Sequence, residues 1–220
     1  MPVELRYPLI VFDWDGTLLD SPSAIVASIQ ESSREMGLSV PSVERASHVI
    51  GLGLKDSLRH AVPDLDEAGY PEFVERYRRH FLAREPAMEL FSGVPELLQG
   101  LRDRGHRLAV ATGKSRKGLD RAFASSGLGD LFVASRCADE TEPKPHPAML
   151  RELMSELGEA PQGLLMIGDT SHDLDMASSA GVDAVAVSFG AHPGEALRER
   201  NPRAVVDSIE ELGAWLARHG

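Results

Sequence analysis

The sequence predicts an α/β fold in which a parallel β-sheet is covered by helices and interrupted by an all-helical insertion. Short runs rich in valine, isoleucine and leucine alternate with helical patterns along most of the chain. This alternation is typical of parallel sheets built from strand–helix–strand units. The runs are apolar throughout, which favours strands that are buried on both faces. Only the stretch 21–84 breaks the alternation.

The strands of the core are predicted from the apolar runs in chain order. They are expected at 9–12, 108–111, 131–134, 164–167 and 184–187. Helical patterns between the later runs predict helices at 117–126, 147–157 and 174–180. The sequence therefore predicts one α/β core domain made of residues 1–20 and 85–220.

The insertion contains helical patterns and no predicted strand. Residues 24–29 and the segment YPEFVERYRRHFLARE (70–85) each place apolar side chains on roughly one face of a helix. Between them, VIGLGLKDSLRHAVPDLDE (49–67) indicates short helices interrupted by glycine and proline. The sequence thus predicts a second domain, a helical cap at 21–84 that is inserted after the first strand.

The composition is that of an ordinary globular protein and narrows the range of partners. Of the 220 residues, 26% are charged and 42% are hydrophobic. With 23 lysines and arginines against 34 acidic residues, the net charge is −11. This acidity argues against binding to nucleic acid or to an anionic membrane, because both need clustered cations. A small phosphorylated substrate needs only a few local cations and stays compatible with it.

Cysteine usage and hydropathy predict a cytoplasmic protein. Cys137 is the only cysteine, so no internal disulfide can form. No run approaches the ~20 apolar residues of a membrane span. The apolar run near the N-terminus is also too short for a secretory signal peptide. We expect a monomer or a homodimer without membrane contact.

Residues with chemical function follow the predicted strands at their carboxyl ends. In chain order these are Asp13, Asp15, Thr112, Gly113, Lys144, Asp169 and Asp173. Because the carboxyl ends of parallel strands meet at one edge of a sheet, these residues are expected to surround one crevice. Asp15-Gly16 alone could be a plain hairpin turn. A hairpin does not explain the other residues.

These residue types are suited to metal-assisted phosphoryl transfer. Carboxylate oxygens are ligands of Mg²⁺, and a divalent cation offsets the repulsion between clustered carboxylates. A carboxylate can also act as a nucleophile and split hydrolysis into two steps. A lysine and a hydroxyl can stabilise charge on the transferred group. The sequence therefore predicts a Mg²⁺-dependent enzyme that acts on a phosphate ester.

The motifs resemble those of the haloacid dehalogenase superfamily. DWDGT (13–17), the strand-ending Thr112, Lys144 in KP, and GDTSHD (168–173) occur in that superfamily's order and rough spacing. DWDGTLLDS, GLGLKDSL, KPHPAML and IGDTSHDLDMASSAG are most similar to its phosphoglycolate-phosphatase-like branch. The resemblance covers nearly the whole chain. It implies a Rossmann-like core with an inserted helical cap, a Mg²⁺ cofactor and an aspartyl-phosphate intermediate.

The resemblance also implies roles for single residues. Asp13 would be the nucleophile, and Asp15 would be the general acid and base that protonates the leaving oxygen and then activates water. Lys144 would pair with Asp13 and with the phosphate. Thr112 and the Gly113 amide would bind phosphate oxygens. The family more often has asparagine at the position of Gly113, and a backbone amide survives that change.

The same resemblance implies a metal site. Asp169 would bind Mg²⁺ together with a side-chain oxygen of Asp13 and the main-chain carbonyl of Asp15. Asp173 would support the site through the metal's waters or by orienting Lys144. Simpler explanations stay open: Asp169 could be a helix N-cap, and Asp173 could complement a helix dipole.

The loop around Lys144 and the histidines lead to two smaller expectations. By resemblance to relatives with a Lys-Pro loop, the Lys144–Pro145 peptide bond is expected to be cis. His48, His146 and His172 are interpreted as ordinary polar residues, since no pair of histidines has the spacing of metal ligands.

In the cap, GLGLKDSLRH (51–60) suggests a contact to the substrate. Lys55 and Arg59 stand four residues apart and share one face if this segment is helical. Such cations would suit a carboxylate-bearing substrate such as phosphoglycolate. A solvated basic face explains the same pattern equally well, because Asp56 and other charges are near.

The expected activity is hydrolysis of a small phosphorylated metabolite, with phosphoglycolate as the leading candidate. A phosphomutase similar to β-phosphoglucomutase would use the same core residues and is the main alternative. A dehalogenase is disfavoured, because it has no leaving oxygen for Asp15 to protonate. A non-catalytic binding module is the remaining alternative, and the filled catalytic positions argue against it.

Overall fold

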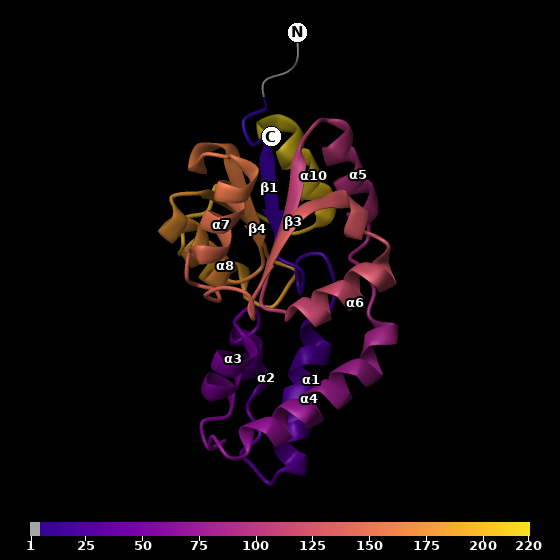
Figure 1. The fold of residues 1–220 in the computed structure, drawn as a ribbon, viewed down its shortest axis with the longest axis vertical. Helices are drawn as coiled ribbons and strands as arrows, with labels where there is room; N and C mark the ends of the chain where they lie inside the picture. Colours follow the sequence, from indigo (N-terminus) through magenta and orange to yellow (C-terminus); the bar gives the residue numbers. More distant parts are fainter. Residues whose placement is uncertain (1–4) are drawn as a thin grey trace.

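The computed structural model describes residues 5–220 and contains a six-stranded parallel sheet with helices on both faces (Figure 1). The strand order is β3-β2-β1-β4-β5-β6. The strands are β1 (Leu9–Phe12), β2 (Arg107–Thr112), β3 (Phe132–Cys137), β4 (Leu164–Gly168), β5 (Asp183–Val187) and β6 (Ala204–Val206). The predicted α/β class with a parallel sheet is confirmed. β1 pairs on both sides, with β2 and with β4.

Alternate side chains of each strand pack against helices on opposite faces of the sheet. In β1, Ile10 and Phe12 join α5 (Val94–Asp103), α6 (Arg116–Ser126) and α10 (Ile209–His219) in one hydrophobic cluster. Leu9 and Val11 join α7 (Ala148–Leu157), α8 (Ser171–Ala180) and α9 (Gly194–Arg198) in the other. The strands are apolar throughout because both faces are covered.

The stretch between β1 and α5 is helical and carries its own hydrophobic cluster. Its helices are α1 (Pro22–Glu35), α2 (Val43–His48), α3 (Leu54–Ala61) and α4 (Tyr70–Arg84), followed by the short 3-10 helix η1 (Glu85–Ala87). Ile29, Leu58 and Phe73 are buried among them. In Figure 1 these helices group below the sheet, apart from the helices that cover its faces. We refer to them as the cap. The domain boundaries at 20/21 and 84/85 stay a prediction.

The edge strands of the sheet differ from the prediction. β3 ends at Cys137 rather than at 134, and Leu131 belongs to the 3-10 helix η2 (Gly129–Leu131). β6 was not predicted at all. Both strands are edges of the sheet and leave several side chains partly exposed, so a search for runs that are apolar throughout misplaces the ends of β3 and misses β6. A further 3-10 helix, η3 (Pro161–Gly163), precedes β4.

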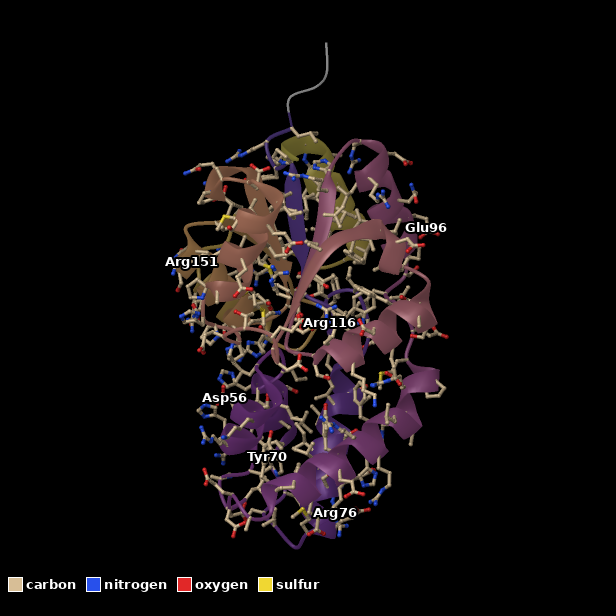
Figure 2. The ribbon with its side chains drawn as sticks, in the orientation of Figure 1. Asp56, Tyr70, Arg76, Glu96, Arg116 and Arg151 are labelled. Carbon is tan, nitrogen blue, oxygen red and sulfur yellow. The ribbon has the colours of Figure 1, made fainter. Side chains whose placement is uncertain are left out.

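Charged side chains lie over the outer surface of both parts of the molecule (Figure 2). On the cap, Arg76 of α4 contacts Glu35 at 2.9 Å and Glu72 at 2.6 Å. Between residues 5 and 220, no helix has the length and apolar character needed to cross a membrane.

Candidate active site

Asp13, Lys144 and Asp173 form a buried row of charges at the carboxyl end of β1. The Asp13 amide donates to the Ile167 carbonyl of β4 at 2.9 Å, so the central part of the sheet fixes this residue. Lys144 Nζ lies 2.8 Å from Asp13 Oδ1 and donates to Asp173 Oδ1 at 2.7 Å. The Lys144–Pro145 peptide bond is cis, as expected. Burial alone would lower the pKa of Lys144, but the two carboxylates raise it above its ordinary value, so the ammonium stays charged.

Asp169 is held at the end of β4 by the loop that follows β1 and by the loop after β5. Its Oδ1 accepts a hydrogen bond from Thr17 Oγ1 at 2.8 Å, and its Oδ2 accepts one from the Ala191 amide at 2.7 Å. A Cβ atom at Gly16, where φ is +80°, would lie 2.2 Å from Oδ2, and one at Gly190 would lie 2.3 Å from it. Both glycines are therefore needed for the close approach of this carboxylate.

Asp173 is engaged by the start of α8 and by Lys144. The N-cap of α8 is Thr170, not Asp169, so helix capping does not explain the buried Asp169 carboxylate. Asp173 Oδ2 accepts from the Thr170 amide at 3.0 Å and from its hydroxyl at 2.7 Å. The remaining oxygen accepts from Lys144. Of the two supporting roles that the resemblance implied for Asp173, the contact that orients Lys144 is present.

The buried carboxylates have the composition and the electrostatics of a metal site. One oxygen from each of Asp13, Asp169 and Asp173 lies within 4.8 Å of the others. Burial raises the pKa of Asp13, although Lys144 opposes the rise, and burial also raises the pKa of Asp169. In residues 5–220 nothing donates a hydrogen bond to Asp13 Oδ2. Three carboxylates thus face one ammonium, and an oxygen-preferring divalent cation such as Mg²⁺ would offset the excess negative charge.

Asp15 is paired with a lysine that the sequence analysis did not single out. Lys114 Nζ lies 2.9 Å from Asp15 Oδ2. Ser21 Oγ donates to Asp15 Oδ1 at 2.6 Å, although this serine is also the N-cap residue of α1. Lys114 Nζ further lies 4.9 Å from the centre of the Phe81 ring in the cap. Its position two residues after Thr112 was the one available sequence signal.

Thr112 and Gly113 lie where β2 meets the cap. Thr112 is fully buried, and its Oγ1 accepts from the Lys114 amide at 3.2 Å. The carbonyl oxygens of Gly51 and Leu52 approach Gly113 so closely that a Cβ atom there would lie 2.6 Å from each. The departure from the family's usual asparagine therefore has a physical reason: in this arrangement the cap loop occupies the space of a side chain.

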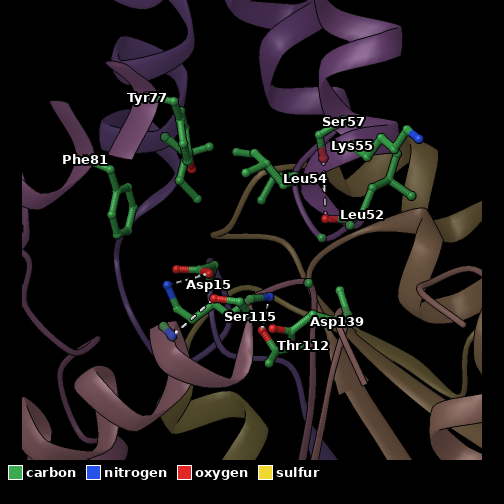
Figure 3. A pocket seen from close by; sticks show the side chains of 18 of the residues that line it. Asp15, Leu52, Leu54, Lys55, Ser57, Tyr77, Phe81, Thr112, Ser115 and Asp139 are labelled. Carbon is green, nitrogen blue, oxygen red and sulfur yellow. Dashed lines mark hydrogen bonds and ion pairs between the residues drawn. The ribbon is translucent and has the colours of Figure 1, made fainter. Parts of the chain in front are cut away.

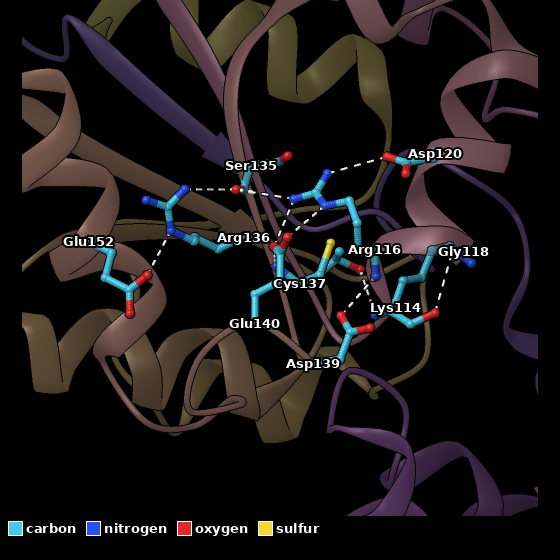
Figure 4. Close-up of polar contacts among 12 residues, drawn as sticks. Lys114, Arg116, Gly118, Asp120, Ser135, Arg136, Cys137, Asp139, Glu140 and Glu152 are labelled. Atoms are coloured by element: carbon cyan, nitrogen blue, oxygen red, sulfur yellow. Dashed lines mark hydrogen bonds and ion pairs between the residues drawn. The ribbon is translucent and has the colours of Figure 1, made fainter.

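Polar contacts fix the segment that carries Gly113 and Lys114 (Figure 4). Arg116 donates from Nε and Nη2 to the two carboxylate oxygens of Glu140, each at 2.8 Å. The Arg116 amide donates to Asp139 Oδ1 at 2.8 Å, and the Ala138 amide donates to the Lys114 carbonyl at 3.0 Å. The start of α6 is thereby tied to the loop that follows β3.

A cavity of about 760 Å³ lies between the cap and the carboxyl ends of the strands (Figure 3). Asp13, Asp15, Thr112 and Gly113 all line it. The structure thus brings together the predicted residues of the floor, while Lys144, Asp169 and Asp173 are buried beside Asp13 and are not among the lining residues.

The predicted pair of cap cations shares the lining of a second pocket of about 250 Å³, and only one of the two also reaches the cavity above the strand ends. Lys55 lines the cavity and Arg59 does not. Arg59 is exposed and lies 3.9 Å from Asp56 and 3.8 Å from Glu67. The solvated basic face that was weighed against substrate binding describes Arg59, and only Lys55 stays a candidate contact.

Three histidines connect the cap to the core beside the site. The His48 carbonyl, at the end of α2, lies 2.8 Å from His172 Nε2 and 3.2 Å from His192 Nε2. The Ser171 amide donates to His192 Nδ1, so a neutral His192 carries its proton on Nε2 and donates to that carbonyl. The rings of His48 and His192 are stacked with centres 5.1 Å apart. Sequence analysis gave His48 and His172 no such role and did not consider His192.

Known proteins resemble this chain in sequence and in fold. The family model of the haloacid dehalogenase-like hydrolases matches residues 10–187. The probable phosphatase IndB of Dickeya dadantii is 35% identical over 93% of this chain and 91% of its own length. A 5'-nucleotidase of Pseudomonas aeruginosa is 34% identical over 98% of both chains. The crystal structure of a predicted phosphoglycolate phosphatase from Haemophilus somnus superposes with a TM-score of 0.86, at 26% identity over 96% of this chain and 98% of that one.

The chain belongs to the haloacid dehalogenase-like hydrolase family. Within the family it falls in the branch that resembles phosphoglycolate phosphatases, and it is an enzyme of the phosphoric monoester hydrolase class.

Proposed function

We propose that this enzyme is a Mg²⁺-dependent phosphatase that hydrolyses a small phosphorylated metabolite in the cytoplasm through an aspartyl-phosphate on Asp13. The observation that carries the proposal is the buried Asp13 carboxylate, whose Oδ2 has neither a hydrogen-bond nor an ion-pair partner among the described residues and which lines the cavity next to Asp15. A carboxylate in this position can attack a phosphorus atom that is placed above it.

In the first step Asp13 attacks phosphorus, and the bond to the ester oxygen breaks as Asp15 gives that oxygen a proton. In the second step Asp15 takes a proton from water, which attacks the aspartyl-phosphate and restores Asp13. Thr112, the Gly113 amide and Lys144 bind the phosphoryl oxygens. Because Asp15 forms an ion pair with Lys114, it must leave this pair and take up a proton before it can act as an acid.

The residues fit Mg²⁺ because their free donor atoms are carboxylate oxygens and their summed charge is negative. Asp13, Asp169 and the main-chain carbonyl of Asp15 would hold the ion, and Asp173 would act by orienting Lys144. When bound, Mg²⁺ would supply positive charge that favours the transfer of an anionic phosphoryl group.

The function is tested with a panel of phosphate monoesters in the presence of Mg²⁺, in which phosphoglycolate serves as the reference substrate. Wild type should release phosphate from at least one member, and radiolabelled phosphoryl substrate should label the protein transiently at Asp13. The proposal is wrong if no ester is hydrolysed or if the Asp13→Asn variant retains turnover.

Lys55 and Arg59 form a matched pair for the carboxylate hypothesis. Lys55→Ala should raise KM for phosphoglycolate, because Lys55 lines the cavity. Arg59→Ala should leave it unchanged, because Arg59 faces Asp56 and Glu67 outside the cavity. Equal values of KM in both variants and in wild type would remove Lys55 from the substrate contacts.

A further inference from the structure

The cavity above Asp13 and Asp15 is much larger than the reference substrate. Phosphoglycolate has about nine non-hydrogen atoms, which occupy about 270 Å³ even if each takes the volume of a water molecule in the liquid. The cavity has about 760 Å³. Pockets of ~300–1,000 Å³ typically enclose ligands of drug size. A two-carbon leaving group would leave most of this space to water.

A raised cap does not account for this volume, because the cap loop is seated on the core. The carbonyl oxygens of Gly51 and Leu52 approach Gly113 so closely that a Cβ atom there would lie 2.6 Å from each. A few residues earlier, the His48 carbonyl lies within hydrogen-bonding distance of His172 and His192. The cavity therefore belongs to an arrangement in which cap and core already touch.

The wall of the cavity is mainly apolar on the side of the cap. Its apolar and aromatic residues come from α1, the segment between α2 and α3, α3 itself and α4, and they include Leu52, Leu54, Val74, Tyr77 and Phe81. Figure 3 shows Tyr77 and Phe81 on one side of the hollow, with Leu52 and Leu54 on the other and Asp15 and Thr112 at the floor.

These opposed walls suit a flat apolar group. A ring system attached to the phosphate can contact Tyr77 on one face and Leu54 on the other, while the phosphate reaches Asp13. Lys114 lies over the Phe81 ring, so among these aromatic side chains Tyr77 is the one that we assign to the ring. A short carboxylate could contact only the charged part of the cap lining, Lys55 or Arg78, and would leave the apolar walls unfilled.

Resting on the phosphatase function proposed above, we propose that the substrate is a phosphate monoester whose alcohol carries a planar ring system of about nucleoside size. Tyr77, Val74 and Leu54 select it by enclosing the ring, and the core residues act on the phosphate. Nucleoside 5'-monophosphates and bicyclic aryl phosphates share this chemistry.

The test compares kcat/KM for four Mg²⁺-supplied esters: adenosine 5'-monophosphate, 1-naphthyl phosphate, phosphoglycolate and glycerol 3-phosphate. At least one ring-bearing ester should exceed both small esters by ~10-fold or more, as expected for a filled apolar pocket. A preference for the nucleotide would show that the cavity also contacts the sugar. A preference for the naphthyl ester would show that it recognises the ring alone. The inference is overturned if a small ester is hydrolysed as efficiently as both ring-bearing ones.

Variants of α4 test the walls directly. Val74→Trp fills the cavity and should lower the ratio of kcat/KM for the ring-bearing ester over phosphoglycolate by ~10-fold or more. Glu75→Ala, one residue along the same helix on an exposed position, should leave the ratio unchanged. An unchanged ratio in Val74→Trp contradicts the assignment of this wall.

A binding measurement separates failure of this inference from failure of the phosphatase function. Calorimetry on the Asp13→Asn variant with Mg²⁺ should show tighter binding of the ring-bearing ester than of phosphoglycolate, and Val74→Trp added to this variant should remove the difference. If wild type hydrolyses no ester, the phosphatase function fails while this result still decides the inference. If small esters bind as tightly, the inference fails while the phosphatase function stands.

Discussion

Asp13 and Asp15 stand two residues apart and meet different surroundings. Asp13 is 1% exposed, fixed through its amide to β4 and paired with Lys144. Asp15 is 8% exposed and is held by two side chains, Ser21 and Lys114. A rigid carboxylate suits attack on phosphorus, and a carboxylate held only by side chains can change partners during proton transfer.

Replacing Asp13 with asparagine should abolish turnover without unfolding the protein. Burial raises the pKa of Asp13, so its ionised form is costly, and the metal-free variant should have a Tm at least equal to that of wild type. Phosphate release and thermal unfolding measure the two effects. Turnover above ~1% of wild type would contradict the role of Asp13.

Replacing Asp15 with asparagine should lower the rate of phosphate release by about 10²–10⁴-fold, as expected for loss of a general acid and base.

Gly113→Asn should lower kcat/KM by about 10- to 100-fold with little change in Tm. The new Cβ atom would meet the carbonyl oxygens of Gly51 and Leu52 at 2.6 Å, so the cap loop must move away from the catalytic floor. Gly127→Asn is the matched control, because Gly127 ends α6 in open space at a positive φ that asparagine tolerates. Unchanged kinetics in Gly113→Asn would show that the loop does not rest on Gly113 during turnover.

The sequence indicated which residues would meet at the site better than it indicated their partners. Asp13, Thr112 and Asp169 follow strands of one parallel sheet, and that topology alone brings strand ends together. Lys114 and His192 depend on how loops and the cap are placed, and no local pattern encodes such contacts. Arg59 shows the limit in the opposite direction: its helical spacing from Lys55 is real, but the cavity lies on the side of Lys55.

At the scale of elements, α5 and the turn that follows it make opposite demands on glycine. Gly100 lies inside α5, where a Cβ atom would meet nothing within 4 Å, whereas Gly105 follows the helix with φ at +97°. Gly100→Ala should therefore raise the free energy of unfolding by about 0.5–1 kcal/mol. Gly105→Ala should lower it, because alanine disfavours that backbone conformation. Urea denaturation measures both changes, and stabilisation by the second variant would refute the argument.

Elements with one clear periodicity were predicted well, whereas the first residue of a helix and a short edge strand were not. α4 was expected at 70–85 and ends at Arg84. α8 was expected from 174 and begins at Ser171, because the Thr170–Asp173 capping box starts the helix before its first apolar residue. β6 escaped notice because three residues at a sheet edge give too short a pattern.

At the scale of the whole molecule, the acidic cluster links stability to pH and to metal. Burial raises the pKa of Asp13 and Asp169 in the folded state above the ordinary value of about 4. The stability that these two carboxyl groups contribute to the metal-free protein is therefore fully present below that ordinary value and is lost as pH rises through the raised pKa values.

Bound Mg²⁺ should restore the stability that the folded protein loses when the buried carboxyl groups ionise. A cation that binds only the folded protein raises Tm. The rise should be larger at pH 8 than at pH 5, because at pH 5 protons compete with the cation for the carboxylates. Chelator should abolish phosphatase activity, and added Mg²⁺ should restore it. A Tm rise that is equal at both pH values would show that these carboxylates are not the ligands.

Because β1 lies inside the sheet, global unfolding and lifting of the cap should expose different parts of the chain to solvent. Its amides and carbonyls face β2 on one side and β4 on the other, so their protons should exchange with solvent only on global unfolding. The loop 49–53 meets the core through the contacts at Gly113, and its amides should exchange whenever the cap lifts. The enzyme can thus admit and release ligands many times during the lifetime of the strand that holds its nucleophile.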